Sequence, residues 1–266
     1  AEMYGRAAGC AKGKGGSMHM FDKPNNLFGG HGIVGAQTPL GAGLAFAARY
    51  EWEVLGTGSK KVALCYLGDG AIDQGAFHEA LNLAAIYSLP VIYVIENNGY
   101  SMGTAIHRHT ANHENLTARG EAYGIKSIKI DGLDIRQVYD TFKRFADDCR
   151  DMQRPGFVDF KTYRYQGHSM SDPQKYRTKD EVDEFKEKDS IANLANHLMN
   201  ERNCLSEEDW KAMRNEIKDE VKDAVDFAEN APDPEMEELF TDVYVNPEPN
   251  LSPTATYTHG EKNPLL

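Results

Sequence analysis

Two polar positions near the middle of the chain have the residue types and the spacing of a ligand site. Asp69, in a Gly-Asp-Gly triplet, follows one apolar run, and Asn98, in an Asn-Asn pair, follows the next apolar run about one β–α–β repeat later. Because the carboxyl ends of parallel strands meet at one edge of a sheet, both side chains are expected there. A carboxylate and a carboxamide beside a helix start suit Mg²⁺ that holds a diphosphate. From spacing alone, an ordinary turn or capping role for Asp69 is an equal alternative.

The elements that must position these two residues alternate between strand and helix patterns. Short apolar runs rich in β-branched residues predict strands at 61–67, 91–95, 125–130 and 157–163. Periodic apolar patterns predict helices at 39–50, 75–87 and 135–151, the first of them with a face of small residues. This alternation predicts an α/β fold with a mostly parallel sheet flanked by helices.

The pattern is different at the two ends of the chain. Residues 5–40 are rich in glycine and read as irregular structure. After Pro173 we expect a helix capped by Thr178, with Glu181 completing a capping box, and further helices over 190–201 and 206–230. The last helix keeps apolar residues on one side, namely Trp210, Met213, Ile217, Val221 and Val225.

Four sequence blocks, taken together and in order, resemble a known enzyme family. They are Lys-Gly-Lys-Gly-Gly-Ser-Met-His at 12–19, Gly-Ile-Val-Gly-Ala-Gln at 32–37, the Gly-Asp-Gly and Asn-Asn pair, and Tyr-Arg-Tyr-Gln-Gly-His-Ser-Met-Ser-Asp-Pro at 163–173. The blocks resemble the α subunits of the pyruvate dehydrogenase first component, in the thiamine-diphosphate-dependent 2-oxo acid dehydrogenase family. The resemblance extends from about Gly5 to about Pro234.

The resemblance implies a fold and a division of the chain. It implies a thiamine-diphosphate-binding fold with a core over 1–175. The residue pattern after the core predicts a helical continuation over 176–245 and a tail over 246–266 that forms a loop or an extended arm. Members of the family have a helical region before the glycine-rich block, and this region includes a Tyr-Arg pair that reaches the substrate and cofactor. We expect it to be missing here, either because the chain is a fragment or because its start was lost.

The resemblance also implies thiamine diphosphate and Mg²⁺ as cofactors and assigns site residues. The implied metal ligands are the side chains of Asp69 and Asn98 and the backbone carbonyl of Tyr100. The implied cofactor-binding residues are Gly32, Val34, Gly68, Asp69, Gly70, Ala71, Asn98, Arg164 and His168. The implied catalytic residues are His168, His19 and Ser169.

General chemistry supports several of these roles and leaves alternatives open. Small residues at Gly70 and Ala71 let backbone N–H groups approach a phosphate, and the guanidinium fork of Arg164 suits a diphosphate. His168 suits the proton transfers of decarboxylation. A packing role for His19 and core packing of Val34 are the open alternatives.

Two serines of the last block match a loop that carries inhibitory phosphorylation in some family members. Ser169 and Ser171 occupy these positions, whereas Gln174 and its neighbours stand where the family has a third serine. A phosphate there would repel the phosphates of the cofactor. We expect a loop that borders the substrate channel, without phosphorylation.

The activity that the resemblance implies is oxidative decarboxylation of pyruvate and reductive acetylation of a lipoyl group. The implied partners are a β subunit, in an α₂β₂ heterotetramer, and a lipoyl-bearing dihydrolipoyl acetyltransferase. An α subunit of an acetoin or branched-chain 2-oxo acid dehydrogenase, and a non-catalytic assembly subunit, are the alternatives. A single-chain transketolase-type enzyme is disfavoured because 266 residues are too few for two such domains.

Composition excludes other classes of protein. The net charge of −12 argues against nucleic-acid binding, and we find no signal peptide and no apolar run of membrane-spanning length. The four cysteines are scattered, which predicts free thiols. The glycines around 9–14 do not have the spacing of a P-loop. We expect the protein to be located in the cytoplasm of a bacterium in preference to a mitochondrial matrix.

Overall fold

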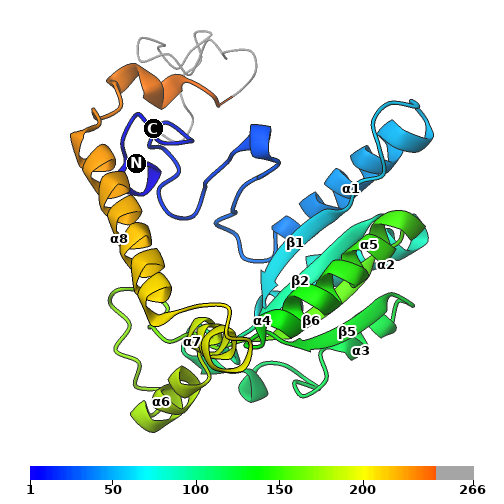
Figure 1. The fold of residues 1–266 in the computed structure, drawn as a ribbon. Coiled ribbons are helices and arrows are strands. Elements are labelled where there is room, and N and C mark those ends of the chain that lie inside the picture. The colour runs from blue at the N-terminus through cyan, green and yellow to red at the C-terminus, as the bar shows by residue number, and fades with distance from the viewer. Residues whose placement is uncertain (244–266) are drawn as a thin grey trace. The chain divides into compact units, whose positions relative to one another are not determined.

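The chain forms two compact units in the computed structural model, which describes residues 1–243 (Figure 1). One unit contains residues 33–212, and the other contains residues 1–32 together with the described residues from 213 onward. The expected tail over 246–266 lies outside the described residues. The division of the chain at residues 175 and 176 stays a prediction.

A four-stranded parallel sheet forms the centre of the 33–212 unit (Figure 1). Its strands are β1 (Ala63–Gly68), β2 (Val91–Asn97), β5 (Lys126–Asp131) and β6 (Gly156–Lys161), in the order β1–β2–β6–β5. All neighbouring pairs are parallel, which confirms the predicted α/β class. β6 ends at Lys161, before the predicted end at residue 163, because its neighbour β2 ends at the register partner of Lys161.

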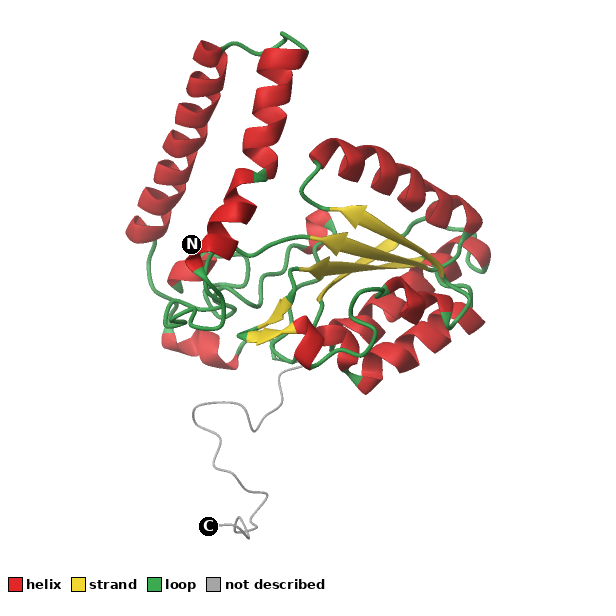
Figure 2. Cartoon of the chain, turned by 90° about the horizontal axis from the view of Figure 1, so that it is seen from below, coloured by secondary structure: helices red, strands yellow, loops and turns green. Residues whose placement is uncertain are grey.

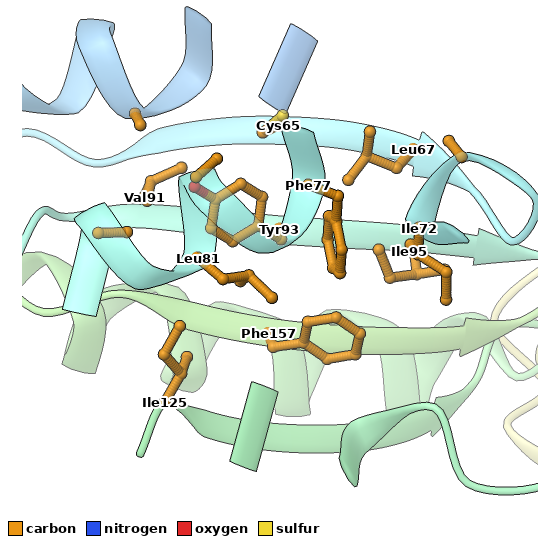
Figure 3. Close-up of a cluster of buried hydrophobic side chains, with 14 of the residues drawn as sticks. Cys65, Leu67, Ile72, Phe77, Leu81, Val91, Tyr93, Ile95, Ile125 and Phe157 are labelled. Atoms are coloured by element: carbon orange, nitrogen blue, oxygen red, sulfur yellow. The ribbon is translucent and has the colours of Figure 1, made fainter. Parts of the chain in front are cut away.

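Helices cover one face of the sheet and bury the larger part of the core. These helices are α1 (Gln37–Glu53), α2 (Gly75–Ile86) and the short α3 (Thr117–Glu121). The rings of Phe77 and Tyr93 meet edge to face with their centroids 6.0 Å apart, above Phe157 (Figure 3). A Cβ on Gly41 would lie 2.9 Å from Cys65 Cβ, so the predicted small-residue face does allow α1 to pack closely.

A second helix layer covers the opposite face (Figure 2). Here Phe145 and Cys149 of α5 (Lys143–Met152) pack against Val94 and Val158 of the sheet. We expected one helix over 135–151. The structure has helix throughout, but α4 (Ile135–Gln137) is followed by a π-helical turn over residues 138–142 before α5 begins. Such a turn accommodates one extra residue within a helix.

The segment directly after β2 contains a β-hairpin that sequence reasoning missed. Its strands are β3 (Tyr100–Ser101) and β4 (Thr104–Ala105), an antiparallel pair. Met102, in the turn between them, has a positive φ of 52°. Strands of two residues are too short to show the alternating pattern on which strand prediction depends.

Helices follow the loop after β6, largely as predicted. α6 (Lys179–Glu187) is capped by Thr178, whose hydroxyl accepts a hydrogen bond from Glu181 N–H. The other half of the predicted capping box is wrong, because the Glu181 carboxylate accepts hydrogen bonds from two tyrosines instead. α7 (Ser190–Asn196) continues as a π-helical turn over 197–201, and α8 (Glu207–Asn230) follows it.

The apolar side of α8 does not mark a buried face within the described chain. Met213, Ile217 and Val221 follow the predicted helical spacing, yet each is about half exposed. No helix within residues 1–243 has both the length and the apolar character needed to cross a membrane. The four cysteines are free, as predicted.

The unit that contains residues 1–32 is irregular, as predicted for the glycine-rich segment. Two single 3₁₀ turns, Glu2–Tyr4 and Lys23–Asn25, are its helical elements before residue 33. The buried Glu2 carboxylate accepts hydrogen bonds from the backbone N–H groups of Ala11, Gly13 and Gly15. Backbone donors around one carboxylate therefore organise a segment that lacks regular secondary structure.

Candidate functional site

Asp69 and Asn98 lie at the same edge of the sheet. Asp69 directly follows β1 and Asn98 directly follows β2, and the strand ends are adjacent because Gly68 and Glu96 are register partners. Asp69 is only 1% exposed, and its Oδ2 accepts a hydrogen bond of 2.7 Å from the backbone N–H of Gly99. The prediction that both residues meet at the carboxyl edge is therefore confirmed.

A glycine that sequence reasoning missed makes this contact possible. Gly99 has a φ of +82°, a left-handed conformation that residues with a Cβ adopt only with strain. The turn points its N–H at Asp69, while Asn98 Oδ1 accepts a hydrogen bond of 3.0 Å from Tyr100 N–H. The Asn98-Gly99 dipeptide is a typical turn signal and could have indicated this geometry.

The Asp69 carboxylate is held where its charge is costly. Burial raises the pKa of Asp69, and hydrogen bonds from the backbone N–H groups of Gly99 and Gly70 oppose the rise. Within the described residues, Asp69 forms no ion pair at salt-bridge distance. A cation bound at its second oxygen would offset the cost of burying the charge.

The donor set at this edge fits magnesium together with a diphosphate. Among the described residues, no three side chains of His, Cys, Asp or Glu converge as a metal cage. A cation here would have one carboxylate, one carboxamide and the carbonyl of Tyr100, all of them hard oxygen ligands. Mg²⁺ typically takes one or two carboxylates and completes its octahedron with water and substrate phosphates.

Small residues leave room beside Asp69. A Cβ placed on Gly68 would meet no atom within 4 Å, whereas a Cβ on Gly70 would lie 2.3 Å from Ser101 Oγ in the hairpin. Ala71 begins a 3₁₀ turn, Ala71–Asp73, and is buried. Gly70 is therefore required by the close approach of the hairpin, and the space outside Gly68 is open to a ligand.

Asp73 anchors this turn and was not identified from the sequence. Its carboxylate accepts hydrogen bonds from Thr110 Oγ1 at 2.7 Å, His109 Nδ1 at 2.9 Å and Arg119 Nη2 at 2.7 Å. These partners, the hydroxyl of Thr110 first among them, outweigh burial and lower the pKa of Asp73. The turn that carries Gly70 and Ala71 is thereby tied to the segment after the hairpin.

The hairpin also connects the edge of the sheet to the loop after β6. Arg164 Nη2 donates hydrogen bonds to the Met102 carbonyl at 2.7 Å and to Tyr176 Oη at 2.8 Å. A Cβ on Gly103 would lie 2.9 Å from Tyr176 Cδ1, so glycine allows the tyrosine ring to pack on the hairpin. Arg164 is thus held against an element that begins two residues after Asn98.

The loop itself is organised by residues to which we had assigned no role. Asp172 accepts hydrogen bonds from the N–H groups of His168 and Gln174 and from Tyr176 Oη. These bonds, from His168 first, lower the pKa of Asp172 to about 2. Arg177 donates to the carbonyls of Tyr165 and two further loop residues, Arg164 and Gln166.

The side chains of His168 and Ser169 are exposed on this loop. Ser169 Oγ lies 3.2 Å from Ser171 Oγ, and Met170 between them is fully exposed. The Asp172 contact fixes the backbone at His168 and leaves the imidazole free to meet a ligand. This exposure is compatible with the predicted catalytic roles, which stay predictions.

The phenol of Tyr100 is committed to a structural contact. It donates a hydrogen bond of 2.8 Å to Glu181 Oε1, and Tyr163 donates to the same oxygen at 3.0 Å. Burial first, and then Glu181, raise the pKa of Tyr100 to about 12, so the phenol is neutral at physiological pH. The predicted metal contact of Tyr100 involves its backbone carbonyl, which this contact leaves available.

Two of the predicted residues belong to the other unit. In the 1–32 segment, His19 Nδ1 donates a hydrogen bond of 3.1 Å to the Gly30 carbonyl, which leaves Nε2 as an acceptor. A Cβ on Gly32 would lie 3.2 Å from His19 Cε1, so the ring packs on this glycine. Val34, which lies in the 33–212 unit, is 60% exposed, so the alternative of ordinary core packing for it is wrong within the described residues.

The fold and the polar edge define the class of protein. Parallel α/β sheets that gather polar side chains and small residues at the carboxyl ends of their strands bind ligands there. The family model for the dehydrogenase E1 component matches residues 1–237 of the chain. The chain belongs to this family, whose members are 2-oxo acid dehydrogenases that depend on thiamine diphosphate.

Curated relatives agree with this assignment. The chain is 50% identical to the pyruvate dehydrogenase E1 component subunit alpha of Rickettsia bellii, over 92% of this chain and 73% of the relative. It is 44% identical to the protein of the same name from Rhizobium meliloti, over 91% of this chain and 68% of the relative. The bovine somatic, mitochondrial form of the subunit is also 44% identical, over 94% of this chain and 61% of the relative.

Proposed function

We propose that this chain is the α subunit of a pyruvate dehydrogenase first component. The observation that carries the proposal is the buried Asp69 carboxylate beside Asn98 at the carboxyl edge of the sheet, in a member of the dehydrogenase E1 component family. The relatives named above, each called a pyruvate dehydrogenase E1 component subunit alpha, support pyruvate as the substrate.

Each residue of the carboxyl edge receives a role in this proposal. Asp69, Asn98 and the Tyr100 carbonyl hold Mg²⁺, and Gly70 and Ala71 offer backbone N–H groups to the diphosphate. When bound, thiamine diphosphate supplies the carbanion-stabilising ring on which a 2-oxo acid can lose CO₂. The open space outside Gly68 supports this arrangement.

The loop after β6 and the sequence blocks at 12–19 and 32–37 receive the remaining roles of the proposal. Arg164 neutralises diphosphate charge, and the exposed imidazole of His168, with Ser169 beside it, meets the reacting substrate. Gly32 and Val34 border the cofactor, and His19, with its Nε2 as the free acceptor, holds or moves a proton.

The proposal includes partner chains. The words "subunit alpha" and "E1 component" in the names of the relatives support a β subunit and a larger complex. We place this chain in an α₂β₂ heterotetramer that transfers the acyl group to the lipoyl group of a dihydrolipoyl acetyltransferase. The bacterial sources of the Rickettsia and Rhizobium relatives support a bacterial cytoplasm as its location.

The test is substrate turnover by this chain co-expressed with its β subunit, followed with an artificial electron acceptor. Pyruvate, a branched-chain 2-oxo acid and acetoin are compared, with and without thiamine diphosphate and Mg²⁺. The proposal predicts turnover of pyruvate that requires both cofactors. Preference for another substrate of the panel would overturn the assignment to pyruvate. A stable α/β complex without turnover of any of them would instead indicate an assembly subunit.

A matched pair of variants controls this test. Asp69→Ala removes the proposed metal ligand, and it is expected to abolish turnover. Asp131→Asn alters an exposed carboxylate at the carboxyl end of β5, the edge strand on the other side of the sheet from β1, and it is expected to leave turnover unchanged. Equal turnover in the wild-type and Asp69→Ala complexes would contradict the assigned metal site.

A further inference from the structure

A second buried acid lies in β6, the strand that pairs with β2. Asp159, in the middle of β6, is 0% exposed. Its Oδ1 accepts a hydrogen bond of 3.0 Å from Asn97 Nδ2 at the end of β2, and Asn97 is 4% exposed. The pair therefore bridges the two central strands of the sheet in a place that excludes water.

Each member of the pair keeps one buried oxygen without a donor. Asn97 Oδ1 and Asp159 Oδ2 are both inaccessible to solvent and have no hydrogen-bond partner among the described residues. Leaving a buried acceptor without a donor costs about 1–3 kcal/mol. Asn97 Oδ1 and Asp159 Oδ2 belong to two side chains that are already joined by a hydrogen bond. A single proton between these two oxygens would give both of them a partner.

The negative charge of an ionised Asp159 would be poorly compensated by its surroundings. Within residues 1–243, the Asp159 carboxylate accepts a single hydrogen bond, from the neutral amide of Asn97, and no cation lies at salt-bridge distance from it. The charged side chains that act on it are Lys129 of β5 and Lys161 of β6. Lys129 Nζ is engaged elsewhere, because it donates to the Glu114 carbonyl at 3.2 Å.

We propose that Asp159 carries a proton in the folded protein and forms a cyclic acid–amide pair with Asn97. Asn97 Nδ2 donates to Asp159 Oδ1, and the acid O–H on Asp159 Oδ2 donates to Asn97 Oδ1. Both orphaned oxygens then have a partner, and no buried charge remains. Asp159 is in this account a positioning residue, which acts on the site through Asn97.

The location of the pair explains what it positions. Asn97 immediately precedes Asn98, and its backbone carbonyl accepts a hydrogen bond of 2.9 Å from Thr162 N–H, where the chain leaves β6 towards Arg164. The acid–amide pair thus holds the end of β2, which Asn98 follows, against β6, which leads to the loop. This positioning role rests on the proposed function, whereas the protonation does not.

The ionisation of Asp159 is expected to change stability in a definite direction. Burial raises the pKa of Asp159, and the Asn97 hydrogen bond only partly opposes the rise. A raised pKa in the folded state means that the stabilisation is complete below the pKa of the unfolded chain and is lost as pH rises through the folded value. Asp159→Asn removes this dependence, because an amide can make the same two hydrogen bonds without a titrating proton.

Infrared spectroscopy of the α/β complex tests the protonation directly. At neutral pH, the difference spectrum between wild type and Asp159→Asn is expected to contain the carbonyl stretch of a protonated carboxyl group. The Asp131→Asn difference spectrum is the control for an aspartate side chain that is exposed. Carboxylate bands in the Asp159→Asn difference spectrum would overturn the proposal. This readout needs neither cofactor nor activity, so its failure is distinct from a failure of the proposed function.

Cofactor activation tests the positioning role. Asp159→Asn, which preserves both hydrogen bonds, is expected to change the thiamine diphosphate concentration for half-maximal activity less than about threefold. Asp159→Ala and Asn97→Ala each remove one member of the pair. Each is expected to raise this thiamine diphosphate concentration at least about tenfold. Wild-type activation in either alanine variant would overturn the positioning role. If neither alanine variant folds, a rise of about tenfold or more in Asp159→Asn overturns it.

Discussion

The strand-end region around Asp69 and Asn98 and the loop that carries Arg164 and His168 are organised in opposite ways. Asp69 is buried and held by a backbone N–H that strand register places beside it. His168 is exposed, and its backbone is held by the side chain of Asp172. The comparison teaches that one half of the proposed site is preformed by the sheet, while the other half depends on a few polar side chains.

The largest effect is expected from a substitution in the preformed half of the proposed site. Asp69→Asn keeps the shape of the side chain and removes its charge, and it is expected to lower cofactor-dependent turnover at least about 100-fold. Because the removed charge is buried and its pKa is raised, the cofactor-free complex is expected to lose less than about 1 kcal/mol in its free energy of unfolding. Turnover and urea unfolding of the same preparation measure both quantities. Retained turnover would count against Asp69 as a metal ligand.

The next effect concerns the contact between the preformed half and the hairpin on which Arg164 is held. Gly70→Ala would place a Cβ against Ser101 Oγ and is expected to weaken thiamine diphosphate binding about tenfold or more. Adding Ser101→Gly removes the obstructing hydroxymethyl group and is expected to recover most of the loss. Fluorescence titration of the α/β complex measures the affinities. If the double variant binds no better than Gly70→Ala alone, the hairpin contact is not the cause.

A smaller effect is expected in the loop. Asp172→Ala removes three hydrogen bonds and is expected to lower turnover about tenfold, with little change in Tm because the loop is exposed. Trypsin is expected to cut more rapidly after Lys175 or Arg177 in this variant, and added cofactor is expected to protect the wild-type loop. A large fall in Tm would show that the loop stabilises the fold and does not act on the site alone.

The pH dependence of the loop sharpens the same comparison. The pKa of Asp172 is lowered to about 2, so its contribution is present above the unfolded value near 3.8 and is lost as pH falls through about 2. The rate at which trypsin cleaves the loop, corrected for the activity of trypsin at each pH, is therefore expected to stay constant between about pH 5 and about pH 8. A steep change in this range would mean that another group controls the loop.

The smallest effect is expected at Ser171. Within the described residues its hydroxyl shares a hydrogen bond with Ser169 Oγ, and its side chain is exposed. Ser171→Ala is expected to change turnover less than about twofold. Steady-state rates with pyruvate measure it. A tenfold loss of turnover would show that the loop conformation depends on the serine pair and not on the Asp172 contacts alone.

Sequence reasoning succeeded where hydrophobic runs determine the structure. The apolar runs before Asp69 and Asn98 had to become parallel strands, and parallel strands place both residues at one edge. It failed where a tertiary contact decides. The capping box at Thr178 was only half right, because the phenols of Tyr100 and Tyr163 take the Glu181 carboxylate.

The loop and the hairpin could not be derived from local patterns. The hairpin depends on the left-handed conformation of Gly99 and on the packing of Tyr176 against Gly103, and this tyrosine lies more than seventy residues further along the chain. Asp172 and Arg177 act through backbone groups of the loop, and such contacts leave no periodic signal. The apolar spacing of α8 predicted a one-sided helix correctly but could not show that this side is exposed.

The most direct test of the account is calorimetric titration of thiamine diphosphate into the α/β complex, with and without Mg²⁺. The account predicts that wild type binds the cofactor in a Mg²⁺-dependent manner and that Asp69→Ala binds it at least about 100-fold more weakly. Asp131→Asn is expected to bind like wild type. Binding by Asp69→Ala with wild-type affinity and wild-type Mg²⁺ dependence would contradict the claim that the carboxyl edge of the sheet holds the cofactor.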